Sequence, residues 1–144
     1  MDERFLKEIQ KRVINLLGTL SDNLQIAAKD QCSEITRLVG RWILDERPEY
    51  KVQICKGTLS GGLAHDVLVI EDGKKLFLID PTIWQIFPES SSIFIGSVGN
   101  MQEALSLLNE KYNGSWKVSE DLYKRDDDSQ KKLLAIIRTN RKEV

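Results

Sequence analysis

Apolar residues near the N-terminus recur at helical spacing. Between residues 3 and 20 they return every three or four positions and leave charged residues on the opposite side, which predicts an amphipathic helix. The polar cluster at residues 21–23 predicts the end of this helix. A second apolar stripe predicts another helix that begins around residues 30–33, after a short helical stretch. It ends at residues 47–48, because proline disfavours helix in the residue before it.

The middle of the chain changes to strand-like patterns. Short apolar runs, some of them alternating, predict strands at residues 51–56, 66–71 and 75–79. Between the last two lies Asp72-Gly73, a dipeptide that favours a two-residue hairpin turn. The remaining predicted elements are a strand, a helix, a strand and a helix, at residues 92–95, 101–112, 116–118 and 129–139. This order predicts one α+β domain over residues 1–144, with N-terminal helices packed on an antiparallel sheet and further helices toward the C-terminus.

Composition places the chain among ordinary globular domains and excludes several classes of function. Of its 144 residues, 41% are hydrophobic and 30% are charged, which suits one packed core. Lysine and arginine number 21 against 22 aspartate and glutamate, and no long basic block occurs, so a nucleic-acid partner is not expected. A membrane partner is not expected either, because no apolar run approaches the roughly 20 residues of a membrane-spanning helix.

The N-terminal sequence does not resemble a secretory signal. It is charged from its second residue and lacks the apolar core of a signal peptide. We therefore expect the chain, taken as given, to be cytoplasmic. Two alternatives stay open, namely export as an effector without a cleaved signal and origin as a domain of a longer protein.

Cysteine and histidine are scarce, and this narrows the possible chemistry. The chain has two cysteines, Cys32 and Cys55, and one histidine, His65. One pair of cysteines is too few for a disulfide scaffold, and the spacings typical of zinc ligands are missing. We therefore expect neither a metal nor another cofactor. Proton transfer near neutral pH usually uses histidine, so acid–base chemistry in this chain points to His65.

Two polar residues flank the predicted hairpin at equal distances from its turn. His65 opens one strand after a glycine-rich loop, and Asp80 ends the next strand before a Pro-Thr dipeptide. With a two-residue turn the two residues fall directly opposite each other, where Cβ atoms lie about 5 Å apart. A hydrogen bond between carboxylate and imidazole is then within reach. The alternatives are a surface histidine at a loop end and an aspartate that caps the following turn.

The two cysteines differ in their predicted surroundings. Cys32 is predicted at the start of the second helix, where the positive end of the helix dipole lowers the pKa of a thiol and favours the reactive thiolate. Cys55 lies within a strand pattern, so we expect it to be structural. A buried structural role is also the alternative for Cys32.

The residues around these side chains resemble a known family. The segments that carry the resemblance are Gln31-Cys32-Ser33, AHDVLV at residues 64–69, LIDPT at residues 78–82 and Gln85-Ile86-Phe87. Together they resemble the papain-like toxin deamidases, bacterial virulence domains that hydrolyse a glutamine side chain on a host protein. The order Cys, His, Asp is shared with transglutaminases and arylamine acetyltransferases, whereas residues 64–87 are more specific. Ile86 separates Gln85 from Phe87, although the family usually places phenylalanine directly after glutamine.

The resemblance implies a papain-like fold with the nucleophilic cysteine at a helix start, and it implies three catalytic roles. Cys32 would be the nucleophile, His65 the general base and acid, and Asp80 the residue that orients the imidazole. An oxyanion hole is also required. Its candidate donors are the backbone N–H of Cys32 and the side chains of Gln25 and Gln31, with a helix-surface amide as the alternative for Gln25.

The resemblance also suggests how a substrate is recognised. Trp84 and Gln85 follow the Asp-Pro-Thr segment and are candidates for lining the substrate cleft, although Trp84 could simply pack in the core. The implied activity is cysteine-dependent hydrolysis of an amide, and the expected substrate is a glutamine side chain of a partner protein. A chain of this size has little material for a long peptide groove, which favours a side chain over general proteolysis.

Other functions remain open at this point. Cysteine proteases and transglutaminases use the same three residue types with a different bond or acyl acceptor. An alternative of another class is a catalytically silent binding module, in which the three residues are structural.

Overall fold

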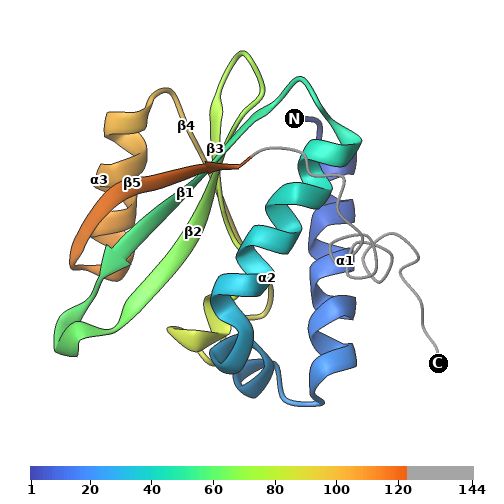
Figure 1. The fold of residues 1–144 in the computed structure, drawn as a ribbon, viewed down its shortest axis with the longest axis vertical. Coiled ribbons are helices and arrows are strands. Elements are labelled where there is room, and N and C mark those ends of the chain that lie inside the picture. The colour runs from blue at the N-terminus through green and yellow to red at the C-terminus, as the bar shows by residue number, and fades with distance from the viewer. Residues whose placement is uncertain (123–144) are drawn as a thin grey trace.

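A computed structural model describes residues 1–122 of the chain, apart from the side chains of residues 24, 25 and 28–31. Within this part, five antiparallel strands form one sheet, and three α-helices cover its two faces (Figure 1). The predicted α+β class with an antiparallel sheet is therefore confirmed. The helix predicted at residues 129–139 lies outside the described residues.

Three helices account for most of the two outer layers. In chain order they are α1 (Glu3–Leu20), α2 (Leu24–Glu46) and α3 (Met101–Tyr112). The ranges of α1 and α3 agree with the prediction, and each helix begins at a side-chain cap. Asp2 accepts a hydrogen bond from the N–H of Phe5 at 2.8 Å, and Asn100 accepts one from the N–H of Glu103 at 2.9 Å. In the described part of the chain, no helix is both long and apolar enough to span a membrane.

The second helix begins earlier than predicted. α2 begins at Leu24 rather than around residues 30–33, because Asn23 accepts a hydrogen bond from the N–H of Ile26 at 3.2 Å and caps the helix there. Once the first turn exists, each further residue adds a hydrogen bond at small entropic cost, whereas a new helix must be nucleated. The helix therefore continues without a break. Cys32 consequently lies about two turns inside α2 and not at its N-terminus.

The strands agree with the prediction to within a few residues, and β5 is longer than expected. Their bounds are β1 (Lys51–Thr58), β2 (Ala64–Glu71), β3 (Leu76–Asp80), β4 (Phe94–Val98) and β5 (Ser115–Leu122). Their order across the sheet is β4-β3-β2-β1-β5. Two short 3₁₀ turns, η1 (Ser60–Gly62) and η2 (Ile83–Gln85), follow β1 and β3.

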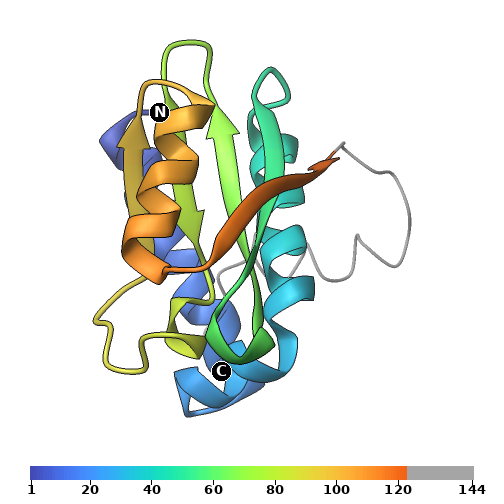
Figure 2. The same ribbon diagram turned by 90° about the vertical axis from the view of Figure 1, so that its left-hand side faces the viewer.

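The sheet separates two hydrophobic cores. One face is covered by α1 and α2 and the other by α3 (Figures 1 and 2). Successive residues of a strand point to opposite faces, so Leu68 of β2 joins the core under α1 and α2, whereas Val67 joins the core under α3. By the same alternation His65 contacts α3, and Asp66 contacts α2.

A close approach between α2 and the sheet depends on Gly40. A Cβ atom at this position would lie 2.5 Å from a methyl group of Leu122 and 2.9 Å from a methyl group of Leu68. Both leucines are buried, at 5% and 0% exposure, so neither side chain has space to move into. Gly40 therefore allows α2 to lie directly against β2 and β5.

Substitution of Gly40 tests this approach. Gly40→Ala is expected to destabilise the protein by about 1–3 kcal/mol through overpacking, although alanine is the better helix former. Gly18→Ala is the matched control, because Gly18 also lies in a helix but a Cβ there meets nothing within 4 Å. It is expected to stabilise the protein by about 0.5–1 kcal/mol. Urea denaturation followed by far-UV circular dichroism measures both effects, and equal effects would contradict a close approach at Gly40.

Candidate functional site

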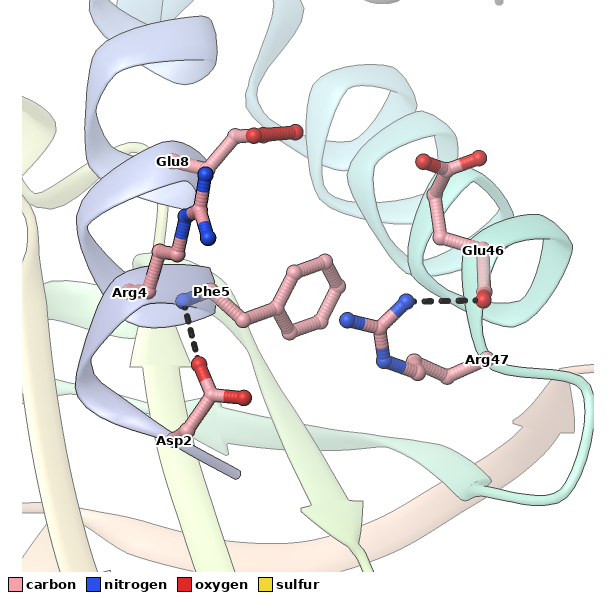
Figure 3. Close-up of a pocket in the computed structure, with 6 residues that line it drawn as sticks. All are labelled: Asp2, Arg4, Phe5, Glu8, Glu46 and Arg47. Atoms are coloured by element: carbon pink, nitrogen blue, oxygen red, sulfur yellow. Dashed lines mark hydrogen bonds between the residues drawn. The ribbon is translucent and has the colours of Figure 1, made fainter.

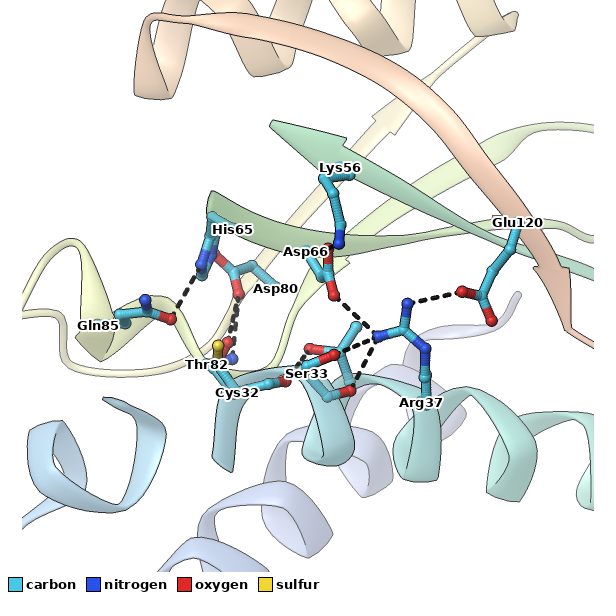
Figure 4. A network of polar contacts seen from close by, with 11 residues as sticks. Cys32, Ser33, Arg37, Lys56, His65, Asp66, Asp80, Thr82, Gln85 and Glu120 are labelled. Carbon is cyan, nitrogen blue, oxygen red and sulfur yellow. Dashed lines mark hydrogen bonds and ion pairs between the residues drawn. The ribbon is translucent and has the colours of Figure 1, made fainter. Parts of the chain in front are cut away.

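The sheet brings the single histidine into contact with a buried carboxylate. His65 is the second residue of β2, and Asp80 is the last residue of β3. Nε2 of His65 lies 2.7 Å from Oδ2 of Asp80, and the two residues are only 1% and 0% exposed (Figure 4). The predicted hydrogen bond between carboxylate and imidazole is therefore present, and His65 is not a surface residue.

The register that produces this contact differs from the prediction. β2 and β3 pair Glu71 with Leu76, so the turn has four residues, 72–75, instead of two. Asp80 is therefore displaced by two positions from the place opposite His65, and the prediction that they are directly opposite is wrong. Because side chains alternate between the faces of a sheet, a shift of two leaves both residues on the same face. The contact is made diagonally between neighbouring strands.

Asp80 accepts hydrogen bonds from several parts of the fold. Its Oδ1 accepts from the backbone N–H of Thr82 at 3.0 Å, so it also caps the following turn. Its Oδ2 accepts from the hydroxyl of Tyr112 as well as from His65. Burial and the charge of Asp80 raise the pKa of Tyr112, which keeps the hydroxyl protonated as a donor. The sequence places Tyr112 only at the end of the helix predicted at residues 101–112, because the local pattern does not say what that helix packs against.

The other ring nitrogen of His65 faces a carboxamide. Nδ1 lies 3.3 Å from Oε1 of Gln85, at the end of η2 (Figure 4). Burial lowers the pKa of His65, but the charge of Asp80, the hydrogen bonds with Asp80 and Gln85 and the charge of Asp66 raise it more. The result is a pKa above the ordinary value of 6.5. A protonated ring donates from both nitrogens, and the two oxygens at this site suit that form.

Cys32 does not have the surroundings that were predicted for it. Its carbonyl accepts a hydrogen bond from the hydroxyl of Thr36 at 2.8 Å, within the continuous helix α2. The helix dipole acts mainly within the first turn, so it does not favour a thiolate two turns inside. Burial and the negative charges of Asp66 and Asp80 instead raise the pKa of Cys32. The prediction of a thiol activated at a helix start is therefore wrong.

Cys32 and His65 approach the end of β3 from different sides. Figure 4 shows the Cys32 side chain directed from α2 toward Asp80 and Thr82, beneath His65. Among the described residues, the ring nitrogens of His65 are hydrogen-bonded to Asp80 and Gln85, and neither is hydrogen-bonded to Cys32. The site therefore contains an oriented imidazole and a separate, half-buried thiol.

The remaining predicted site residues have different outcomes. The side chains of Gln25 and Gln31 lie outside the described residues, so their role as oxyanion donors stays a prediction. The backbone N–H of Cys32 lies inside α2, where the helix uses it for its own hydrogen bond. Trp84 does not line a cleft, because it is 2% exposed, packs in the core under α1 and α2, and donates from Nε1 to the carbonyl of Ser90. Burial of so large an aromatic ring is strongly favourable, provided that its N–H finds a partner.

An aromatic wall beside His65 has no counterpart in the sequence-based prediction. Gly57 of β1 pairs with His65 on one side and with Trp116 of β5 on the other, so the three residues form a row across the sheet. A Cβ at Gly57 would lie 2.4 Å from the Trp116 ring, so the indole covers the glycine. The indole meets the imidazole edge-on, with ring centroids 6.4 Å apart. A glycine inside a strand pattern is the signal that marks such a close approach.

A separate pocket of about 330 Å³ lies between the start of α1 and the end of α2 (Figure 3). It is lined by Asp2, Arg4, Phe5, Glu8, Glu46 and Arg47. The guanidinium of Arg47 lies over the ring of Phe5, 4.2 Å from its centroid. This pocket is at the other end of α2 from Cys32, so it takes no part in thiol chemistry. Among the described residues, no group of three or more histidine, cysteine, aspartate or glutamate side chains could hold a metal ion.

Titration of His65 tests its pairing with Asp80. Because the chain has one histidine, its imidazole NMR signals belong to His65 alone. We expect the pKa of His65 to lie above 6.5 in the native protein and to fall in Asp80→Asn, because the charge of Asp80 is the largest effect that opposes burial. Asp121→Asn changes an exposed carboxylate on β5 and is the matched control, with no expected effect on this pKa. The same pKa in the native protein and in Asp80→Asn would contradict the pairing.

The same pairing is expected to make stability depend on pH. A histidine whose pKa is raised by folding stabilises the native state fully below its unfolded pKa, and this contribution is lost as the pH rises through the folded pKa. The free energy of unfolding is therefore expected to decrease from slightly acidic to slightly alkaline pH, and to decrease less in Asp80→Asn. Urea denaturation across this pH interval measures both slopes.

Comparisons with known proteins do not assign the chain to a family. No family model, no curated protein and no solved structure matches it. The candidate site therefore rests on the residues and contacts described above.

Proposed function

We propose that this chain is a cysteine-dependent amidohydrolase that deamidates a glutamine side chain of a protein substrate. In this proposal Cys32 is the nucleophile and His65 is the general base and acid. Asp80 orients the imidazole. The chemistry needs no cofactor, because the three side chains and water supply every group that reacts.

The buried pair of His65 and Asp80 is the observation that carries the proposal. Removal of an imidazole and a carboxylate from water costs free energy unless both are hydrogen-bonded and their charges are paired. Tyr112 and Thr82 supply two further donors to the carboxylate. A histidine that must keep one orientation during proton transfer benefits from such a partner.

The position of Gln85 supports the proposal that the reacting group of the substrate is an amide. Its carboxamide is the functional group of the proposed substrate, and it lies 3.3 Å from Nδ1 of His65, the ring nitrogen that Asp80 does not use. The surroundings of Nδ1 can therefore accommodate a carboxamide. A substrate glutamine would displace Gln85, which is half-buried at the end of a short turn.

The proposed reaction has two halves. The thiol of Cys32 gives its proton to His65 and attacks the amide carbon, so a carbon–sulfur bond forms. The carbon–nitrogen bond then breaks, and His65 returns the proton to the nitrogen, which leaves as ammonia. In the second half, His65 takes a proton from water and the hydroxide attacks the thioester. The carbon–sulfur bond breaks, and His65 returns the proton to the sulfur of Cys32. Glutamine and water thus become glutamate and ammonia.

A catalytically silent binding module is the second candidate, and one observation favours it. The pKa of Cys32 is raised, chiefly by burial, so the thiol lacks the activation expected of a nucleophile. The pair of His65 and Asp80 would then be a structural part of the core.

A protease and a transglutaminase would share the thioester intermediate and differ in the bond cleaved or in the acyl acceptor.

Modification of a target protein is expected to require Cys32. Incubation with the native chain is expected to add about 1 Da per modified glutamine and to leave the target uncleaved, because deamidation replaces –NH₂ by –OH. Cys32→Ala is expected to abolish this change and to leave the circular dichroism spectrum as in the native protein. Cys55→Ala is the matched control and is expected to keep activity, because Cys55 is fully buried and burial raises its pKa to about 11.

Peptide mass spectrometry of the treated target separates the alternatives. Cleaved fragments without deamidated glutamine would identify a protease, and incorporation of an added amine would identify a transglutaminase. No Cys32-dependent change in any target would favour the binding module. Activity that survives Cys32→Ala and is lost in Cys55→Ala would exchange the roles of the two thiols.

A further inference from the structure

Arg37 connects two segments that adjoin the proposed catalytic residues. Its Nη1 donates hydrogen bonds to the hydroxyl of Ser33 at 2.6 Å, to the carbonyl of Ser33 at 3.2 Å and to Oδ2 of Asp66 at 2.8 Å (Figure 4). Ser33 directly follows Cys32 on α2, and Asp66 directly follows His65 on β2. One guanidinium therefore links the neighbour of the thiol to the neighbour of the imidazole.

This link is largely buried. The Asp66 side chain is 5% exposed and the Arg37 side chain 20%. The second oxygen of Asp66, Oδ1, is buried without a hydrogen-bond partner among the described residues, and Nζ of Lys56 lies 3.9 Å from it. Arg37 is thus the hydrogen-bonded cation that compensates the buried charge of Asp66. A buried pair of this kind resists separation, because either partner alone would be an uncompensated charge.

Arg37 also has an outer contact that can be removed separately. Its Nη2 donates to Oε1 of Glu120 on β5 at 2.6 Å, and the Glu120 side chain is 38% exposed. The outer contact reaches the rim of the sheet, whereas the inner contacts join α2 to the beginning of β2. A substitution at Glu120 therefore leaves the inner contacts in place.

The charges around Cys32 and Arg37 come from every neighbouring layer. The titratable groups are Glu34 and Cys32 on α2, Lys56 on β1, His65 and Asp66 on β2, Asp80 on β3, Tyr112 on α3 and Glu120 on β5. Negative charges outnumber positive ones near the thiol, so the distance from Cys32 to the imidazolium of His65 decides whether a thiolate is favoured. Whatever sets this distance controls the reactivity of the thiol.

We propose that Arg37 is a positioning residue that sets the separation of Cys32 from His65, by holding Ser33 on α2 and Asp66 on β2 through one guanidinium. The inference rests on the proposed function, because it assigns Arg37 to the same pair of reacting groups. The competing explanation is that Arg37 serves only as the counter-ion of Asp66.

The test follows alkylation of Cys32 by iodoacetamide as a function of pH, with the labelling of each cysteine resolved by peptide mass spectrometry. A thiol coupled to His65 has a rate profile with an inflection at the pKa of His65, which NMR titration measures independently. We expect this inflection in the native protein. Arg37→Lys keeps the charge and loses the planar fork, so we expect the inflection to disappear and the rate at neutral pH to fall about tenfold.

Two further variants distinguish a positioning role of Arg37 from a role of its charge alone. Glu120→Ala, the matched control, removes only the outer contact and is expected to keep the native profile. Arg37→Met alone leaves Asp66 uncompensated and is at risk of unfolding. The double variant Arg37→Met with Asp66→Asn removes both charges, and we expect it to fold and to lack the inflection as well.

The outcomes distinguish this inference from the proposed function. An inflection that persists in Arg37→Lys would overturn the positioning role. An inflection that is present in the double variant would show that Arg37 serves only as the counter-ion of Asp66, and would also overturn the positioning role. An inflection absent from the native protein would overturn the pairing of Cys32 with His65, and the proposed function would fail together with this inference.

Discussion

The buried hydrogen bond between His65 and Asp80 is the interaction on which this end of the fold depends. Two ionisable groups almost wholly removed from water are stable only if their polar atoms find partners. The end of α3 contributes the hydroxyl of Tyr112, the turn after β3 contributes the N–H of Thr82, and η2 contributes the carboxamide of Gln85. The packing of α3 and the course of the chain after β3 are therefore constrained by the needs of one pair of side chains.

The sheet divides the candidate site between two layers. Successive residues of β2 point to opposite faces, so His65 lies with α3, whereas Asp66 lies with α2. Cys32 is carried by α2 and therefore approaches from the side of Asp66. A reaction that uses both the thiol and the imidazole must take place where the two layers meet, at the end of the sheet. Arg37 joins α2 to the beginning of β2 beside this end of the sheet, through its hydrogen bond to Asp66.

The structure favours the proposed role of the His65 imidazole more than that of the Cys32 thiol. His65 is held in one orientation, and the charge of Asp80 favours its protonated form against the effect of burial. The thiol of Cys32 is opposed by burial and by nearby carboxylates, and its place inside α2 removes the assistance of a helix N-terminus. An imidazolium at close range lowers the pKa of a thiol, so the separation of the two groups is the quantity that decides reactivity.

The sequence by itself determined the fold class, most element ranges and the contact of His65 with Asp80, because periodicity and spacing are local properties. The contact was predicted although the turn is two residues longer than expected, because a shift of two positions keeps both side chains on the same face of the sheet. The start of α2 was decided by the cap at Asn23, which nucleates the helix upstream of the place where the apolar stripe begins. Only the tertiary structure decided that Tyr112 reaches Asp80 across 32 residues and that Arg37 reaches Asp66 across 29. Partners so far apart in the chain meet through the packing of helices on the sheet, and no local pattern specifies that packing.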